Sequence, residues 1–371
     1  MTPLRALSAL RLPTFLHPAR ALVRTKRRIS VLVAGLAAAT AMLLAGCASP
    51  PPVSGPDQPA LPGIQAAEDG SHQWQDLDWV DAHRDRAVPV RVYWPTAEAP
   101  PGGWPVIVFS HGMGGSRRGY SYLGSYWASQ GFVALHVQHI GSDRRLWSGG
   151  FSVTNSLNLV TRLQHAAQPE EAIDRTQDVR FALDQLLAGP LGPRLDRARM
   201  AIAGHSYGAN TSLLLAGAKV PAPSHLLGAS TPLPAMADPR FKAAILISAP
   251  PFYGEGDPGA ILSGIAIPTL HISATDDEIT IPGYYSGAAD RVRLFDAIGG
   301  PRKALAMFNG GSHSIFTDRM NTGGLALNPK VKAATRELSL AYLRLVLDGQ
   351  DAPLRDWQTR HGMLLARWQA P

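Results

Sequence analysis

The sequence predicts an α/β fold, in which helices cover both faces of a mostly parallel central sheet. Short apolar runs rich in β-branched residues alternate along the chain with longer segments whose apolar residues recur at helical spacing. This alternation is typical of strands that are joined by helical crossovers and therefore run parallel. The 371 residues, 45% of them hydrophobic and 17% charged, are enough for one large domain or two modest ones. They exclude wholesale disorder, a collagen repeat and a coiled coil.

The predicted elements begin near residue 90. Residues 106–109 (Val-Ile-Val-Phe) are apolar without a break, as expected of a central strand buried on both faces. A helix is predicted over about 120–130, where Gly131 ends it, and another over 169–187, where Pro169 stands at its start. The other elements are assigned in the same way: strands at 90–94, 132–137, 200–203, 243–247, 269–272 and 304–308, and a helix at about 331–347.

The positive charge of the chain is confined to its N-terminal segment. The formal net charge is +7, with 35 Lys and Arg against 28 Asp and Glu. Residues 1–46 contain seven of the basic residues and no acidic residue, so basic and acidic residues balance in the remainder. The folded part therefore lacks the basic excess of a protein that binds nucleic acid electrostatically.

The same segment has the organisation of an export signal. A basic cluster at 24–28 precedes an apolar, Ala-rich run at 29–45, which are two parts of a secretory leader. An uncleaved membrane anchor is the alternative, because the run is only marginally long enough to span a bilayer. Residues 44–47 (Leu-Ala-Gly-Cys) favour export, since they resemble the bacterial lipobox, whose cysteine is lipidated and becomes the mature N-terminus. Ala48 after that cysteine implies retention in the outer membrane of a Gram-negative cell.

Cys47 is the only cysteine in the chain, which excludes disulfides within it. The sequence thus predicts a lipoprotein signal peptide at 1–46, a Pro-rich tether at 47–73 and one folded catalytic domain at 74–371. The protein is then expected in the cell envelope, held at a membrane by an N-terminal lipid anchor.

Residues 200–215 contain a strand, a Gly-x-Ser-x-Gly turn and a helical pattern, in that order. The turn is Gly204–Gly208, with Ser206 at its centre. In this context the glycines permit a tight turn that exposes the serine hydroxyl above the sheet, at a helix N-terminus that favours developing negative charge. The motif alone also occurs by chance in a Gly-rich chain, so the flanking strand and helix carry the prediction that Ser206 is a nucleophile. A structural serine in a strand–helix turn is the alternative.

A serine hydroxyl needs a base to take its proton, and the base needs a group that orients it. His313 follows the strand at 304–308 and has flexible glycine neighbours, a combination that none of the other histidines has. The strand at 269–272 leads into the acidic residues Asp276 and Asp277. Because functional groups gather beyond the carboxyl ends of parallel strands, these residues are expected near Ser206. A surface-loop position is the alternative for His313.

Four other histidines are expected to have structural roles or to lie near the site, rather than to act as the base. His205 lies inside the turn and His271 within a strand, where packing or polar support is expected. His136 and His139 close an earlier strand and could line the mouth of the site, but no acidic or cysteine cluster gives them the spacing of metal ligands. The sequence implies no metal or organic cofactor.

Acyl transfer at a serine also needs two backbone N–H groups that face the developing oxyanion. One is expected from Tyr207, directly after Ser206. The other is expected from the loop at 110–115 (Ser-His-Gly-Met-Gly-Gly), whose glycines let the backbone approach the site, and Met113 is the predicted donor. A Gly-rich turn without a catalytic role is the alternative.

Residues 109–114 (Phe-Ser-His-Gly-Met-Gly) and 204–208 together resemble motifs of the platelet-activating factor acetylhydrolases in the α/β-hydrolase superfamily, and more broadly those of esterases similar to dienelactone hydrolase. The order Ser, Asp, His along the chain is also that of α/β-hydrolases. The resemblance covers roughly 85–345 and implies the α/β-hydrolase fold with a Ser-His-Asp triad. One departure is that 246–250 (Leu-Ile-Ser-Ala-Pro) has no carboxylate where the acetylhydrolases place their acid. The acid is therefore expected one strand later, as in bacterial polyesterases and dienelactone hydrolases.

Only one of two adjacent aspartates can serve His313, because successive side chains at an extended strand end point in opposite directions. In the related hydrolases the acid commonly precedes a small spacer and then an Ile or Val. Asp277, Glu278 and Ile279 match that spacing. The sequence therefore predicts Asp277, with Asp276 as the alternative and Glu278 as a more distant one.

Together these residues predict a serine hydrolase that cleaves carboxylic esters of small-molecule or lipid-like substrates through an acyl-enzyme. Two alternatives remain open: an amidase or peptidase with the same triad, and a catalytically idle envelope lipoprotein on the same fold. Several aromatic residues lie in loops after strands and could line an apolar pocket or pack as a lid: Trp147, Phe151, Phe252 and Tyr253.

Overall fold

A computed structural model of the chain describes residues 63–371, except 149–152, 220–235, 252–256 and 282–283. The predicted signal peptide at 1–46 and the predicted lipidation site Cys47 lie outside the described residues. The predicted tether at 47–73 lies partly within them, and there it contains strand β1 (Gln65–Ala66) and the start of strand β2 (His72–Asp81). None of the helices in the described part of the chain is long and apolar enough to cross a membrane.

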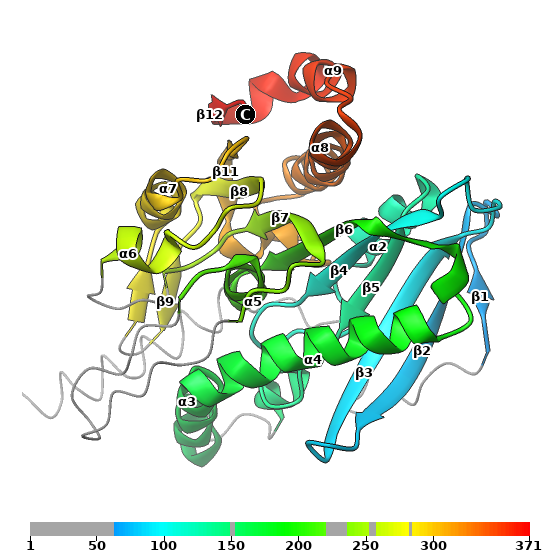
Figure 1. Cartoon of the computed structure of the whole chain (residues 1–371). Helices are drawn as coiled ribbons and strands as arrows, with labels where there is room; N and C mark the ends of the chain where they lie inside the picture. The colour runs from blue at the N-terminus through cyan, green and yellow to red at the C-terminus, as the bar shows by residue number, and fades with distance from the viewer. Residues whose placement is uncertain (1–62, 149–152, 220–235, 252–256, 282–283) are drawn as a thin grey trace, which may run out of the picture. The chain divides into compact units, whose positions relative to one another are not determined.

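Ten strands of the described residues form one sheet, and its central part is parallel, as predicted (Figure 1). The apolar runs predicted as central strands, such as 106–109 and 243–247, lie in this central part, where both faces of a strand are covered. In sheet order the parallel strands are β5 (Val133–Val137), β4 (Trp104–Ser110), β6 (Leu195–His205), β7 (Phe241–Ile247), β8 (Thr269–Asp276) and β11 (Ala304–Ser312).

Antiparallel strands extend the sheet at both edges. Strand β3 (Arg86–Pro95) pairs with β5 and with β2, which pairs in turn with β1. At the other edge β12 (Leu365–Gln369) pairs with β11. A separate hairpin joins β9 (Ile279–Ile281) to β10 (Tyr284–Ser286) directly after β8.

Helices cover both faces of the sheet, as the predicted fold requires. One layer contains α4 (Pro169–Ala188), α5 (Tyr207–Ala216), α6 (Pro258–Leu262) and α7 (Ala288–Ala297). The other layer contains α2 (Ser121–Ser129), α8 (Asn328–Asp348) and α9 (Ala352–His361). A further helix, α3 (Val153–Ala166), packs beside the short helix Arg144–Trp147.

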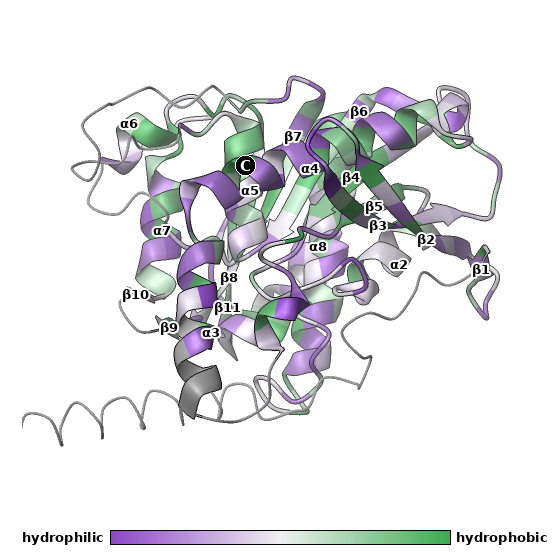
Figure 2. Ribbon diagram, turned by 90° about the horizontal axis from the view of Figure 1, so that it is seen from below, coloured by the Kyte–Doolittle hydropathy of each residue, from purple (hydrophilic) through white to green (hydrophobic). Residues whose placement is uncertain are grey.

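Alternation along the strands divides the core between the two layers. In β4, Val106 and Val108 pack with the α4–α5 layer, whereas Ile107 and Phe109 pack with the α2–α8 layer. All four are buried, and burying such a side chain contributes about 1.5–3 kcal/mol. Figure 2 shows the hydrophobic colouring of β4 and β5 at the centre of the sheet. The loops at the carboxyl ends of these strands therefore stand on a closely packed platform.

Candidate active site

Ser206 sits in a strained turn between β6 and α5. Its backbone has φ 54° and ψ −121°, a conformation that costs on the order of 1–3 kcal/mol and persists only where the surroundings enforce it. Two glycines make the turn possible. A Cβ at Gly204 would lie 2.1 Å from the carbonyl oxygen of Gly208, and a Cβ at Gly208 would lie 1.9 Å from that of Ser110. The helix after Ser206 is thus packed directly against the end of β4.

A glycine-containing bulge at the end of β11 carries His313 toward Ser206. The pairing of β11 with β8 shifts register between Phe308 and Ser312, where Gly310 and Gly311 have φ values of 77° and 100°. Immediately after this bulge, His313 opens a short helix, and its Nε2 lies 2.8 Å from the Ser206 hydroxyl oxygen. The glycines that the sequence singled out therefore have a defined structural use.

The carboxylate that contacts His313 belongs to Asp277, which follows the last residue of β8. Its Oδ1 lies 2.7 Å from His313 Nδ1, and its Oδ2 accepts a hydrogen bond of 2.5 Å from the Ser273 hydroxyl. Arg291, on α7, donates to Oδ1 over 3.3 Å. Asp277 is fully buried, whereas Asp276 is exposed and its carboxylate accepts from the Thr275 hydroxyl. The structure thus brings Asp277 to His313 and leaves Asp276 and Glu278 out of this contact.

The surroundings keep Asp277 ionised. Burial by itself would raise the pKa of this carboxyl group, but His313, the Arg291 guanidinium and the Ser273 hydroxyl together hold the pKa well below its usual range. An ionised carboxylate only accepts hydrogen bonds, so His313 donates its Nδ1–H to Asp277. This tautomer leaves the Nε2 lone pair facing Ser206. The arrangement can therefore take the proton of the serine hydroxyl and stabilise the resulting imidazolium.

The two residues that the sequence predicts as oxyanion donors, Met113 and Tyr207, belong to segments that lie next to Ser206. Tyr207 is the first residue of α5, where an amide has no intrahelical acceptor. A Cβ at Gly112 would lie 3.2 Å from the Ser206 Cβ, so the loop that contains Met113 packs directly on Ser206. Within the described part of the chain, the amides of Met113 and Tyr207 donate to no other backbone group. Both amides therefore remain candidate donors to an oxygen beside Ser206.

His205 supports the position of His313. Its Nε2–H donates to the backbone oxygen of His313 over 3.0 Å, and its Nδ1 accepts from the Tyr120 hydroxyl over 2.7 Å. Burial, with a smaller effect of the nearby His313, lowers the pKa of His205 to about 3, so the ring is neutral at ordinary pH. This is the polar support predicted from its place in the turn. His271 is buried within β8 and contacts the Thr269 hydroxyl, as expected of a packing residue.

The structure corrects the prediction for His136 and His139, which do not line a mouth. His136 is buried and packs against aromatic rings, among them Phe109. His139 is buried between the Ser110 hydroxyl and Asp178. The sequence placed both at the close of this strand, but His136 lies within β5 and packs toward α2, and His139 is held between α4 and the end of β4. In the described residues, no group of three or more His, Cys, Asp or Glu side chains could hold a metal ion.

Three of the four aromatic residues that the sequence suggested for a pocket or lid lie outside the described residues: Phe151, Phe252 and Tyr253. Trp147 is described, with 43% of its surface exposed. Its indole N–H donates to the Gly114 carbonyl oxygen over 3.1 Å. Trp147 therefore lies against the same loop as Met113.

Sequence reasoning missed several residues that hold the site together. Arg291 and Ser273 bind Asp277, Tyr120 binds His205, and Arg175 binds the loop after β4. One signal was present in the sequence. Arg175 and Arg291 each interrupt the buried stripe of an amphipathic helix, and a cation at such a position must find acceptors inside the protein.

Comparison with known proteins supports this reading of the fold. A ferulic acid esterase from Streptomyces cinnamoneus superposes with a TM-score of 0.52 at 21% identity, over 82% of this chain and 95% of the esterase. The chain has the α/β-hydrolase fold. A cold-adapted esterase from an Arctic intertidal metagenomic library matches 78% of this chain at 18% identity, with a TM-score of 0.48.

Sequence matches confirm the predicted resemblance to acetylhydrolases over a shorter range. Residues 61–144 match the family model described as platelet-activating factor acetylhydrolase, isoform II. The platelet-activating factor acetylhydrolase of Cavia porcellus is 31% identical over 138 residues, which are 29% of this chain and 30% of that protein. The chain thus matches less than a third of the length of this curated relative. The family-model match includes the Met113 loop and ends before Ser206.

Proposed function

We propose that the protein is a carboxylic ester hydrolase that acts through an acyl-enzyme on Ser206. The observation that carries this proposal is the continuous chain of hydrogen bonds from Ser206 through His313 to the buried Asp277, beside two free backbone amides. A serine that is activated by an oriented imidazole and faces an oxyanion site is the arrangement that acyl transfer requires.

The proposed reaction has two similar halves. His313 takes the Ser206 proton at Nε2 while the serine oxygen attacks the ester carbonyl, and the carbonyl oxygen becomes an oxyanion bound by the amides of Met113 and Tyr207. Collapse of this intermediate breaks the ester bond, and the leaving alcohol takes the proton from His313. Water then attacks the acyl-serine with the same assistance and releases the carboxylic acid and free Ser206. Asp277 holds the imidazole tautomer and stabilises its positive charge.

Small-molecule or lipid-like esters are the proposed substrates. The similarity to an acetylhydrolase over the segment that contains Met113 supports an ester over an amide bond. The absence of a basic excess outside residues 1–46 argues against nucleic acid as a partner. The half-exposed Trp147 beside Gly114 supplies an apolar surface next to the oxyanion amides, which suits an apolar acyl or alcohol group.

The test is the turnover of p-nitrophenyl esters of graded acyl length by wild type and Ser206→Ala. Because the triad acts as a unit, kcat should fall by about 10⁴ or more in Ser206→Ala, and labelling by a fluorophosphonate probe should be lost. Ser212→Ala is the matched control, since it removes a nearby hydroxyl, on the helix that follows Ser206, which donates to the Gly208 carbonyl oxygen. Ser206→Ala activity within tenfold of wild type contradicts the proposal. Turnover of the matching anilides but not of the esters would replace the esterase by an amidase.

We further propose that Cys47 is lipidated and anchors the protein to the outer membrane of the cell envelope. The basic cluster, the apolar run and the lipobox-like residues 44–47 support this proposal. A single acyl chain binds membranes only marginally, whereas several anchor a protein stably. Cys47→Ser should release the protein from membranes or block its processing and leave esterase activity unchanged. Equal metabolic labelling of wild type and mutant by a palmitate analogue contradicts the anchor.

A further inference from the structure

Arg175 lies behind the candidate active site with every terminal nitrogen engaged. It projects from the buried side of α4 and is fully buried. Its Nη2 donates to the backbone oxygen of His111, in the loop after β4, and, over 3.0 Å, to the hydroxyl of Ser110, the last residue of β4. Its Nε donates to Thr211 on α5 over 2.9 Å. One guanidinium therefore binds the two segments that follow β4 and β6.

Each of these two segments carries one of the proposed oxyanion amides. The His111 carbonyl that Arg175 binds lies two residues before Met113 in the same loop. The Thr211 hydroxyl that Arg175 binds itself donates to the Tyr207 carbonyl oxygen over 3.2 Å. The guanidinium also stacks on the ring of Tyr207, with its carbon 4.4 Å from the ring centroid. Arg175 thus contacts the surroundings of both amides and touches neither amide itself.

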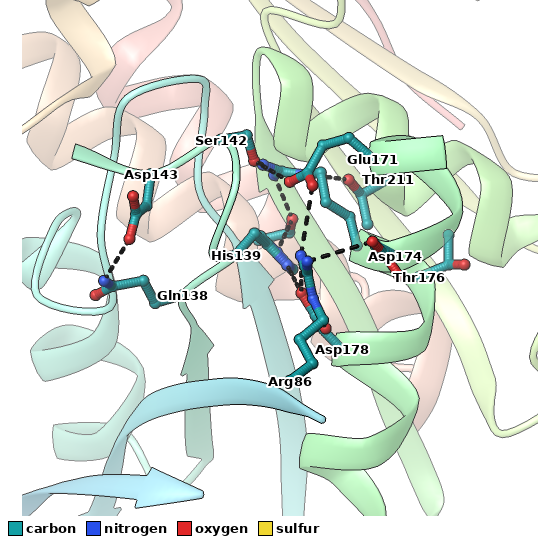
Figure 3. Close-up of polar contacts among 12 residues, drawn as sticks. Arg86, Gln138, His139, Ser142, Asp143, Glu171, Asp174, Thr176, Asp178 and Thr211 are labelled. Carbon is teal, nitrogen blue, oxygen red and sulfur yellow. Dashed lines mark hydrogen bonds and ion pairs between the residues drawn. The ribbon is translucent and has the colours of Figure 1, made fainter. Parts of the chain in front are cut away.

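The acceptors of Arg175 are held in place by a second set of buried contacts (Figure 3). Arg175 Nη1 donates over 2.6 Å to Ser142, whose hydroxyl donates over 2.6 Å to the carboxylate of Glu171. His139 contacts the Ser110 hydroxyl and Asp178, over 2.9 and 3.1 Å. Because Ser110 accepts from Arg175, its own hydrogen is free to donate to the neutral ring of His139. Donors and acceptors match at each step of this network.

A purely stabilising role does not explain this arrangement. All four hydrogen-bond acceptors of Arg175 are uncharged oxygens, and among the described residues Glu171 reaches it only through Ser142. A buried cation without a directly paired anion is costly, and an apolar side chain of similar volume would often be as stable. What an apolar side chain cannot do is fix the distance and angle between two polar backbone segments.

We propose that Arg175 is a positioning residue for the oxyanion site: it fixes the Met113 loop relative to the N-terminus of α5, so that both amides face one oxygen. This inference rests on the proposed function. A displacement of about 1 Å at a reacting centre can reduce a rate by 10²-fold, and loss of one oxyanion donor reduces kcat by about 10²–10³-fold. Loosening the two segments should therefore slow the chemical step far more than it weakens substrate binding.

The first test compares Arg175→Met and Arg175→Lys with Arg180→Met. Arg180 lies on the same helix and donates to backbone oxygens at Met236 and Ala237, away from the site. For a p-nitrophenyl ester, kcat should fall about 10- to 100-fold in Arg175→Met with KM within threefold of wild type. Arg175→Lys should retain only part of the activity. A lysine keeps the positive charge, but one ammonium cannot bind both segments as the guanidinium does. Arg180→Met should match wild type.

The second test measures the binding of an oxyanion directly. An aryl trifluoromethyl ketone forms a tetrahedral adduct with the serine whose oxygen occupies the oxyanion site, whereas the corresponding secondary alcohol forms no adduct. In Arg175→Met the inhibition constant of the ketone should rise by the factor by which kcat/KM falls, and that of the alcohol should not change. A residue that only stabilises the fold would not separate the two inhibitors.

A gentler pair of variants keeps the proposal testable if Arg175→Met does not fold. Thr211→Val and Ser212→Ala each remove a buried hydroxyl of α5 that bonds to the backbone one turn earlier, but only Thr211 also accepts from Arg175. Thr211→Val should lose severalfold in kcat and in ketone affinity, and Ser212→Ala should lose neither.

Two results overturn the positioning role alone: a folded Arg175→Met with kcat and ketone affinity within threefold of wild type, or a Thr211→Val that equals Ser212→Ala. A wild-type protein without Ser206-dependent ester turnover overturns the proposed function, and this inference with it.

Discussion

Asparagine at position 277 removes the negative charge beside His313 and keeps the size of the side chain. In the structure, Asp277 Oδ1 accepts from both His313 and Arg291, while Oδ2 accepts from Ser273. An asparagine can therefore keep its oxygen toward His313 and turn its amide toward Ser273, whose hydroxyl can accept as well as donate. The tautomer of His313 then survives and only the charge is lost.

The size of the expected effect follows from this geometry. The Nδ1–Oδ1 distance of 2.7 Å places the centres of the two delocalised charges about 4 Å apart, and at an effective dielectric constant of about 20 their attraction is about 4 kcal/mol. At 1.36 kcal/mol per tenfold change, loss of that attraction slows the step that forms the imidazolium by about 10³-fold. If the amide faces His313 instead, the wrong tautomer forms and the loss approaches 10⁴-fold. Asp277→Asn should therefore reduce kcat by about 10³- to 10⁴-fold.

The assay is p-nitrophenyl ester turnover, with thermal unfolding by circular dichroism as a check that the variant is folded. Asp276→Asn is the matched control, because its exposed carboxylate accepts a hydrogen bond from Thr275 and none from His313. It should keep kcat within threefold of wild type. A folded Asp277→Asn within tenfold of wild type, or a larger loss in Asp276→Asn, would refute the assignment and the electrostatic reasoning with it.

Three further outcomes are expected. Gly208→Ala should abolish folding or lower Tm by many degrees, because its Cβ would lie 1.9 Å from the Ser110 carbonyl oxygen, and a normal Tm contradicts this packing. Burial lowers the pKa of His136 and of His271 to about 3, against about 6.5 in the unfolded chain. Between these pH values the unfolded state binds more protons than the folded state. The free energy of unfolding should therefore fall as the pH decreases from about 6.5 to 3. His271→Gln should reduce that slope by about 1 kcal/mol per pH unit in urea titrations near pH 5, and an unchanged slope opposes the attribution. Dialysis against EDTA should leave ester turnover unchanged, whereas loss that is restored by a divalent metal contradicts a metal-free reaction.

The parts of the fold that could be predicted are those in which a short stretch of sequence indicates by itself that its residues are buried or closely packed. Strands β4 and β7 are buried on both faces by helices, and their sequences are correspondingly apolar over successive residues. The turn at Ser206 could be predicted because close packing leaves no room for side chains at Gly204 and Gly208. The approach of Ser206, Asp277 and His313 then follows from the parallel sheet, since each follows the carboxyl end of a strand.

The parts that could not be predicted depend on partners far apart in the sequence. Strand β2 lacks an apolar alternation, because buried Asp76 is paired there with Arg91 of β3 and Arg118 of a later loop. The acceptors of Arg175 lie 33 to 65 residues away along the chain. A buried charge in a helix can be recognised from the sequence, but the residues that satisfy it are found only when the sheet order is known.

The departure from the acetylhydrolase pattern can be explained by the donors available at each strand end. At the end of β7, Ser248 is fully buried with φ 51°, and its hydroxyl lacks a hydrogen-bond partner among the described residues. A carboxylate there would be buried in a strained backbone without a donor of its own, which is unfavourable for an ionised group. At the end of β8, Ser273 and Arg291 supply donors to both oxygens of Asp277, in addition to His313. A transfer of the acid to β7 would therefore require new donors there, so that Ser248→Asp combined with Asp277→Asn should not restore turnover.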